Sequence, residues 1–240
     1  MSDADSTCWT MVEGAGRGDA AAQSWFAREY GPLVERYLAA RWAGSARRQE
    51  IADATQEVFL ECYRDGGALA KVDRDRGRSF RAFLFGIVRN VARRIEGTPA
   101  RRRETALTSE APEPTSREAS LSVLFDRTWA RKMMADAARE QRRAATEAGG
   151  EALRRVELLE LRFQRGLAIR EIAAEWQEDP THLHRQYALA REEFRRALFR
   201  VLEQVQGGSA ENLEQECTFL LSLLGGEGSD RPDTGDATHP

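Results

Sequence analysis

Residues 161–200 read LRFQRGLAIREIAAEWQEDPTHLHRQYALAREEFRRALFR. Gly166 interrupts one helical pattern, and a short amphipathic segment follows at about 169–176. Asp179-Pro180 then opens a longer helix that extends to about residue 205. Aspartate at the N-cap followed by proline at the first helical position is a strong start signal. Two helices joined by a tight polar turn predict a helix-turn-helix module.

The longer helix of this module has two contrasting faces. Apolar residues at spacings of three and four predict its buried stripe: Leu183, Tyr187, Ala190, Phe194, Ala197 and Val201. The opposite face carries Thr181, Arg185, Ala188, Arg195 and Arg196, with His184 and Arg191 at its flank. Small and basic side chains on an exposed helix suit base edges in a major groove. The alternative is a helical hairpin with an ordinary solvated basic face.

Helical periodicity dominates the rest of the chain, and strand signals are nearly absent, so we predict an all-α protein. Further helices are expected at about 19–38, 48–64, 79–96, 119–148, 151–164 and 210–224, with Gly31-Pro32 kinking or splitting the first. Residues 97–118 contain three prolines and one large apolar residue, which predicts a flexible linker. We therefore expect two small helical domains, at 18–96 and 119–205, and an acidic tail at 206–240 with one short amphipathic helix.

Residues 79–96, SFRAFLFGIVRNVARRIE, form a second notable pattern. Their expected core stripe consists of Phe80, Phe83, Leu84, Ile87, Val91 and Ile95. Arg89, Asn90 and Arg93 project away from that stripe, and Phe85 is also left on the outer side. An exposed aromatic ring beside arginines suits stacking on unpaired bases. The alternative is that Phe85 packs on a neighbouring helix.

Residues 49–64, QEIADATQEVFLECYR, form a third pattern. Periodicity turns four side chains inward: Ile51, Thr55, Val58 and Cys62. It leaves Asp53, Gln56, Glu57 and Leu60 together on the outer face. A leucine surrounded by acids and an amide suggests a docking surface for a basic protein partner. A charged face with one stray leucine is the alternative.

Charge is segregated along the chain, although the net charge is only −3. Residues 74–103 hold ten arginines against two acids, a local charge of +8. Residues 203–240 hold eight acids against one arginine, a local charge of −7. A basic middle and an acidic tail suggest a polyanionic partner that the tail avoids.

Several classes of protein are disfavoured. The longest apolar run, around 219–224, is far shorter than a membrane span, and the acidic N-terminus lacks an apolar signal segment. Three widely spaced cysteines suggest neither a disulfide framework nor a metal site, which fits a reduced cytoplasm. His182 and His184 are two residues apart, so a helix splays them and metal ligation is disfavoured. Without a catalytic grouping or Walker loop, we expect no enzyme, no cofactor and no metal.

Two parts of the chain resemble one known family. The segments DATQEVFLECYR and SFRAFLFGIVRNVARR resemble the first conserved domain of bacterial RNA polymerase sigma factors, particularly the small extracytoplasmic-function (ECF) type. The helix-turn-helix segment is similar to their second DNA-binding domain. Together the two similarities cover about 18–96 and 119–203. The resemblance implies a subunit that gives core RNA polymerase promoter recognition and strand opening.

The resemblance also implies roles for the three surfaces. The outer face of 49–64 would grip the clamp helices of the largest polymerase subunit, through Asp53, Gln56, Glu57 and Leu60. The −10 element, where bases are flipped from the stack, would meet Arg78, Arg81, Phe85, Arg89, Asn90, Arg93 and Arg94. The −35 element of promoter DNA would meet Thr181, His182, His184, Arg185, Arg191 and Arg195.

The sequence departs from the family pattern in two places. Phe83 or a neighbour stands where the family usually has tryptophan, and Gln177-Glu178 stands where the turn commonly has glycine and an aliphatic residue. Without glycine, a positive φ is harder to reach in that turn. Two other functions stay open: a stand-alone helix-turn-helix regulator of duplex DNA, and a sigma-derived module that sequesters a partner. An anti-sigma factor is a further candidate partner.

Overall fold

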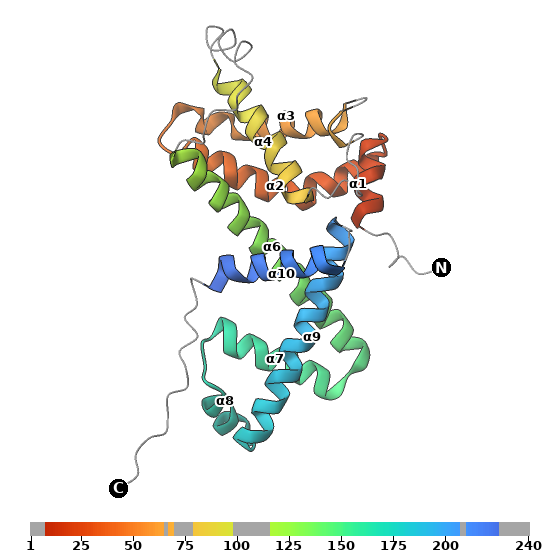
Figure 1. Cartoon of the computed structure of the whole chain (residues 1–240), viewed down its shortest axis with the longest axis vertical. Coiled ribbons are helices and arrows are strands. Elements are labelled where there is room, and N and C mark those ends of the chain that lie inside the picture. Colours follow the sequence, from red (N-terminus) through yellow and green to blue (C-terminus); the bar gives the residue numbers. More distant parts are fainter. Residues whose placement is uncertain (1–7, 65–66, 70–78, 98–115, 207–209, 226–240) are drawn as a thin grey trace. The chain divides into compact units, whose positions relative to one another are not determined.

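The computed structural model describes residues 8–64, 67–69, 79–97, 116–206 and 210–225, and their regular structure is entirely helical. Figure 1 labels the α-helices: α1 (Cys8–Gly16), α2 (Ala20–Arg41), α3 (Ile51–Tyr63), α4 (Phe80–Glu96), α6 (Ser116–Ala148), α7 (Gly150–Gln164), α8 (Ile169–Trp176), α9 (Pro180–Gln206) and α10 (Ala210–Gly225). A short 3₁₀ helix, Ala46–Glu50, precedes α3. The all-α prediction is therefore confirmed for this part of the chain. None of these helices is both long and apolar enough to cross a membrane.

Two compact units divide the chain. The first contains α1 to α4, residues 116–129 of α6 and residues 204–210, and the second contains the remaining parts of α6 to α10. The second domain was expected to begin at 119, so the division falls about ten residues later than the predicted boundary. The reason is that the first half of α6 packs on the first unit: Trp129 stacks on Tyr30, with ring centroids 6.0 Å apart.

Aromatic rings fill the core of the first unit. Phe26 lies at its centre, with ring centroids 4.8 Å from Tyr30, 6.0 Å from Phe59 and 6.2 Å from Phe80. Tilted and edge-to-face pairs of this kind contribute roughly 0.5–1.5 kcal/mol each beyond their buried area. This cluster ties α2, α3 and α4 together and so holds the outer faces of α3 and α4 in fixed positions.

Helix α1 was not predicted from the sequence. Its Trp9 is buried and meets Phe80 edge-on, with ring centroids 6.2 Å apart. Val12 and Ala15 are buried as well. The spacing of three residues between Trp9, Val12 and Ala15 was a helical signal, but a short one.

The helix starts follow local sequence signals. Asp19 accepts a hydrogen bond from the backbone N–H of Ala22 (2.9 Å), and Asp179 accepts one from His182 (2.7 Å). Both predicted N-caps are therefore present. The sequence predicted a kink or a split at Gly31-Pro32. In the structure, α2 continues through Pro32 as one helix and is not split. Buried side chains on both sides of the proline offset its cost of about 3 kcal/mol inside a helix.

Candidate nucleic-acid interface

Three of the four residues predicted on the outer face of α3 are exposed. Asp53 and Gln56 are exposed, and Leu60 is 62% exposed. On the opposite side Thr55 and Val58 are buried. A single exposed leucine is common on protein surfaces, but here it lies among acidic and amide side chains, and this combination is compatible with a protein contact.

Glu57, the remaining member of this face, is half-buried and does not stand alone. The Arg94 guanidinium of α4 donates hydrogen bonds to Glu57 (2.7 Å) and to Glu61 (3.2 Å), both on α3. Arg94 was assigned to DNA and Glu57 to the polymerase. The structure therefore joins these two expected surfaces through one ion-pair cluster.

Helix α4 begins where Ser79 accepts a hydrogen bond from the backbone N–H of Ala82 (3.2 Å), and Gly97 ends it. On its outward side Asn90, Arg93 and Arg94 are exposed, whereas Arg81 and Arg89 are half-buried. Arg78 lies outside the described residues. The arginine-rich face is present, but it is less open than the sequence indicated.

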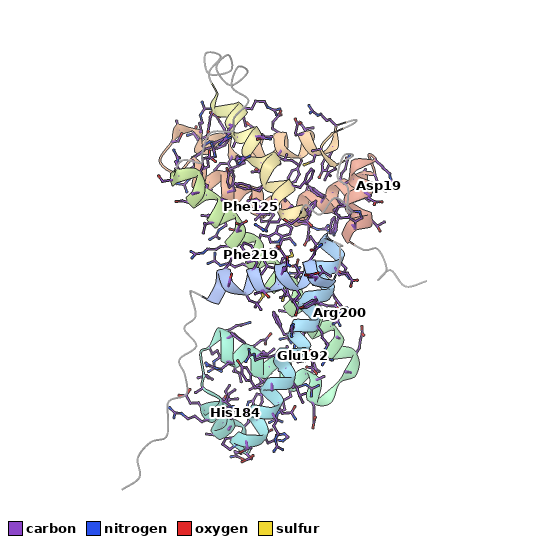
Figure 2. The ribbon with its side chains drawn as sticks, viewed as in Figure 1. Asp19, Phe125, His184, Glu192, Arg200 and Phe219 are labelled. Carbon is purple, nitrogen blue, oxygen red and sulfur yellow. The ribbon has the colours of Figure 1, made fainter. Side chains whose placement is uncertain are left out.

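Phe85 is not on an open outer face, and the expected exposure of its ring is wrong. The ring lies 5.1 Å from Phe125 of α6 and 5.7 Å from Tyr37 of α2, measured between centroids. Arg89 covers it, with the guanidinium carbon 5.5 Å from the ring centroid. The alternative, packing on a neighbouring helix, is what the structure contains. Figure 2 labels Phe125 on the part of α6 that makes this contact.

A charged network beside this face was missed at the sequence level. Arg41 of α2 is only 6% exposed, and its guanidinium donates to both carboxylate oxygens of Glu96 at 2.7 Å and to Glu118 at 2.9 Å. It also donates to the Tyr37 hydroxyl (3.0 Å), and the Trp42 indole donates to Glu96 (2.7 Å). The partners lie 55 and 77 residues away, so no local pattern could indicate them.

The network lowers the pKa values of its two carboxyl groups. Burial by itself would raise the pKa of Glu96, but hydrogen bonds from Arg41 and Trp42 outweigh it and lower that pKa. Glu118 behaves in the same way: burial opposes ionisation, and Arg41 together with Arg93 more than compensates. Both groups are therefore carboxylates at neutral pH. They join the ends of α2 and α4 to the start of α6.

In the second unit, α7, α8 and the start of α9 pack around one apolar cluster. Its buried members are Leu158, Leu161, Ile169, Ile172, Ala173 and Leu183. The backbone N–H of Ala168 donates to Glu171 (2.6 Å), which stabilises the first turn of α8. This cluster fixes the orientation of α9 relative to α8.

The turn between α8 and α9 reaches a positive φ without glycine. Gln177 has φ 55° and ψ 40°, and the backbone N–H of Glu178 donates to the Ala173 carbonyl (2.9 Å). This is the geometry of a Schellman motif, which usually has glycine at the left-handed position. Glu178 pairs with Arg154 (2.5 Å), whose guanidinium lies 4.6 Å from the centroid of the Trp176 ring. Tertiary contacts therefore compensate for the unfavourable backbone conformation.

The predicted polar face of α9 is solvent-exposed along its length. The exposed side chains are Thr181, His182, His184, Arg185, Arg191 and Arg195. Figure 2 labels His184 near the start of this helix. Arg195 pairs with Glu214 of α10 (2.9 Å), and Arg191 lies 5.8 Å from the centroid of the Tyr187 ring. The first turns of α9, where Arg185 lies, carry no such pairing with the tail among the described residues.

Comparison with known proteins adds one match. Residues 26–104, which contain α3, α4 and most of α2, match the family model of sigma-70 region 2. No curated protein and no solved structure matches the chain. The matched stretch contains the exposed face of α3 and the arginine-rich face of α4. In this part the chain is therefore similar to region 2 of the sigma-70 family.

Proposed function

We propose that this protein is a sigma factor that binds core RNA polymerase and directs promoter recognition and the start of transcription. The match of residues 26–104 to sigma-70 region 2 carries this proposal. More narrowly, we propose a sigma factor of the ECF type, because the sequence resemblance is closest to that type. The protein would act in the cytoplasm as a binding subunit, without catalysis of its own.

The contact with polymerase is assigned to the outer face of α3. Asp53, Gln56 and Glu57 offer acceptors to basic side chains, and Leu60 offers apolar area that a partner would remove from water. The partner would be the clamp helices of the largest polymerase subunit. Acidic residues around an apolar centre support a protein contact in preference to a contact with DNA, because phosphates would be repelled.

The −10 element is assigned to α4, and the −35 element to α9 as the second helix of a helix-turn-helix. The exposed arginines of α4 support the first assignment. The tight turn at Gln177 and the exposed polar face at the start of α9 support the second. One chain that contacts both promoter elements gains avidity without improving either contact.

Run-off transcription with core RNA polymerase on genomic fragments tests the proposal. We expect discrete start sites that depend on this protein, with upstream sequences shared among the active fragments. Binding to duplex DNA without any polymerase-dependent transcript would instead identify a stand-alone regulator. Absence of both activities would favour the protein-interaction module.

A further inference from the structure

We propose that residues 116–129, the first half of α6, cover the side of α4 that carries Phe85 and Arg81 in the free protein and compete with nucleic acid for it, while Asn90 and Arg94 stay exposed. We call this stretch the covering segment. The inference rests on the proposed role of α4 in DNA binding. It goes beyond that role, because it states that another segment of the same chain competes with DNA for α4.

Apolar packing holds the covering segment in place. Leu121, Phe125 and Trp129 are spaced four residues apart and are all buried. Phe125 contacts Phe85 of α4 and also lies 6.0 Å from Tyr37 between ring centroids. The sequence pattern suggested that the Phe85 ring stacks on an unpaired base, and in the packed arrangement it could do so only after the covering segment moves away. While Phe125 occupies that position, a base has no access to the same side of Phe85.

The charges of the covering segment reinforce this arrangement. Asp126 forms an ion pair with Arg81, and Glu118 lies 3.5 Å from the Nε atom of Arg93. These carboxylates occupy positions beside arginines where phosphate oxygens of DNA would otherwise bind. The same arginine cannot be neutralised fully by a carboxylate and by a phosphate at once. The apolar contacts and the carboxylates of the covering segment therefore both oppose the binding of nucleic acid to α4.

The contact also carries costs, which partly offset the apolar packing and the Arg41–Glu118 ion pair that hold it in place. The Trp129 Nε1–H and the Arg89 Nε–H are buried without a hydrogen-bond partner among the described residues. An unsatisfied buried donor costs free energy that exposure to water would recover. In addition, burial raises the pKa of Asp126 more than the neighbouring Arg81 lowers it, so the Arg81–Asp126 ion pair carries a desolvation cost.

Two measurements on the full chain test the proposal. The first is hydrogen–deuterium exchange, with and without a short fluorescein-labelled single-stranded DNA at low salt. We expect DNA to accelerate exchange of the amides of residues 117–128, while those of α2 keep their rates. The second is the affinity for the same DNA after Phe125→Ala. This uncharged truncation weakens the cover without adding positive charge near the DNA.

We expect Phe125→Ala to tighten DNA binding at least tenfold, which corresponds to about 1.4 kcal/mol. Met133→Ala is the matched control, because Met133 is also fully buried on α6 but belongs to the second unit. It should leave the affinity unchanged. Circular dichroism of both variants confirms that their helices are retained.

Equal or weaker DNA binding by Phe125→Ala, or unchanged exchange in the covering segment when DNA binds, would overturn the inference. Absence of DNA binding by both the native chain and the variant would overturn it as well. The proposed function has a separate readout, since run-off transcription could succeed in each of these cases. Failure of transcription with core polymerase would instead refute the sigma-factor assignment.

Discussion

Arg94 on α4 donates a hydrogen bond to Glu57 on α3 across 2.7 Å. Both side chains are partly exposed, at 40% and 46%, so water screens the pair and its contribution to stability is at most about 1 kcal/mol. The same ion pair joins the surface proposed for the −10 element to the surface proposed for the polymerase. Either partner could therefore exchange this contact for an external one at low cost.

The surface proposed to bind polymerase can be tested by replacing its acidic and apolar side chains with basic ones. The double variant Asp53→Arg/Leu60→Arg replaces an acid and the exposed leucine with positive charge. We expect it to abolish co-purification with core polymerase and to retain native helicity. The matched control is Glu211→Arg/Leu221→Arg on α10, which makes the same charge change at an exposed acid and leucine. Undiminished co-purification of the first variant would contradict the assignment.

The Arg41 network should dominate the stability of the first unit. Replacing Arg41 with alanine leaves the carboxylates of Glu96 and Glu118 without their shared cation. Removing one partner from a buried ion pair costs about 3–5 kcal/mol, so the free energy of unfolding should fall by that order. Urea denaturation measures it. As a control, Arg47→Ala removes an exposed pair with Glu50 and should change stability by less than about 1 kcal/mol.

Acid should weaken the same network. The folded-state pKa values of Glu96 and Glu118 lie below the ordinary value of 4.5. Their contribution to stability is therefore complete above that value and is lost as the pH falls through the lower folded-state values. We expect the urea midpoint to fall as the pH drops below about 5. The Glu96→Gln variant should start from a lower midpoint and show a smaller decrease; an equal decrease would contradict the role of Glu96.

The turn between α8 and α9 offers a stabilising change. Gln177 has a positive φ, which costs a residue with a side chain roughly 1 kcal/mol relative to glycine. Gln177→Gly should therefore raise the free energy of unfolding of the second unit by up to about 1 kcal/mol. Glu175→Gly, inside α8, is the matched control and should lower it instead. Destabilisation by both variants would show that the Gln177 side chain contributes more than its backbone costs.

The two proposed DNA surfaces should fail in different ways. Arg185→Ala at the start of α9 should reduce base discrimination at the −35 element by about 1–3 kcal/mol, if it contacts a base through two hydrogen bonds. Arg93→Ala on α4 should instead weaken strand opening at the −10 element. Permanganate footprinting separates these effects, because it detects unpaired thymines. Equal melting defects in both variants would argue against this division.

The sequence by itself determined most of the helices, though not α1, and much of what faces inward. Asp19 and Asp179 cap their helices because an N-cap needs only a backbone N–H three residues away. In the predicted stripe of α9, Leu183, Ala190, Ala197 and Val201 are buried and Tyr187 and Phe194 are half-buried. This pattern and the exposed Leu60 on α3 follow from a period of 3.6 residues, which is also a local property. The exposed polar face at the start of α9 was predictable for the same reason.

Only the tertiary structure decided what covers the outward face of α4. Periodicity marked Phe85 as lying off the core stripe, but it carried no information about which helix would approach it. Phe125 comes from 40 residues further along the chain, and Glu118 reaches Arg41 across 77 residues. Contacts of this kind depend on how separately formed helices pack, because side chains that match each other in shape and charge leave no regular spacing in the sequence.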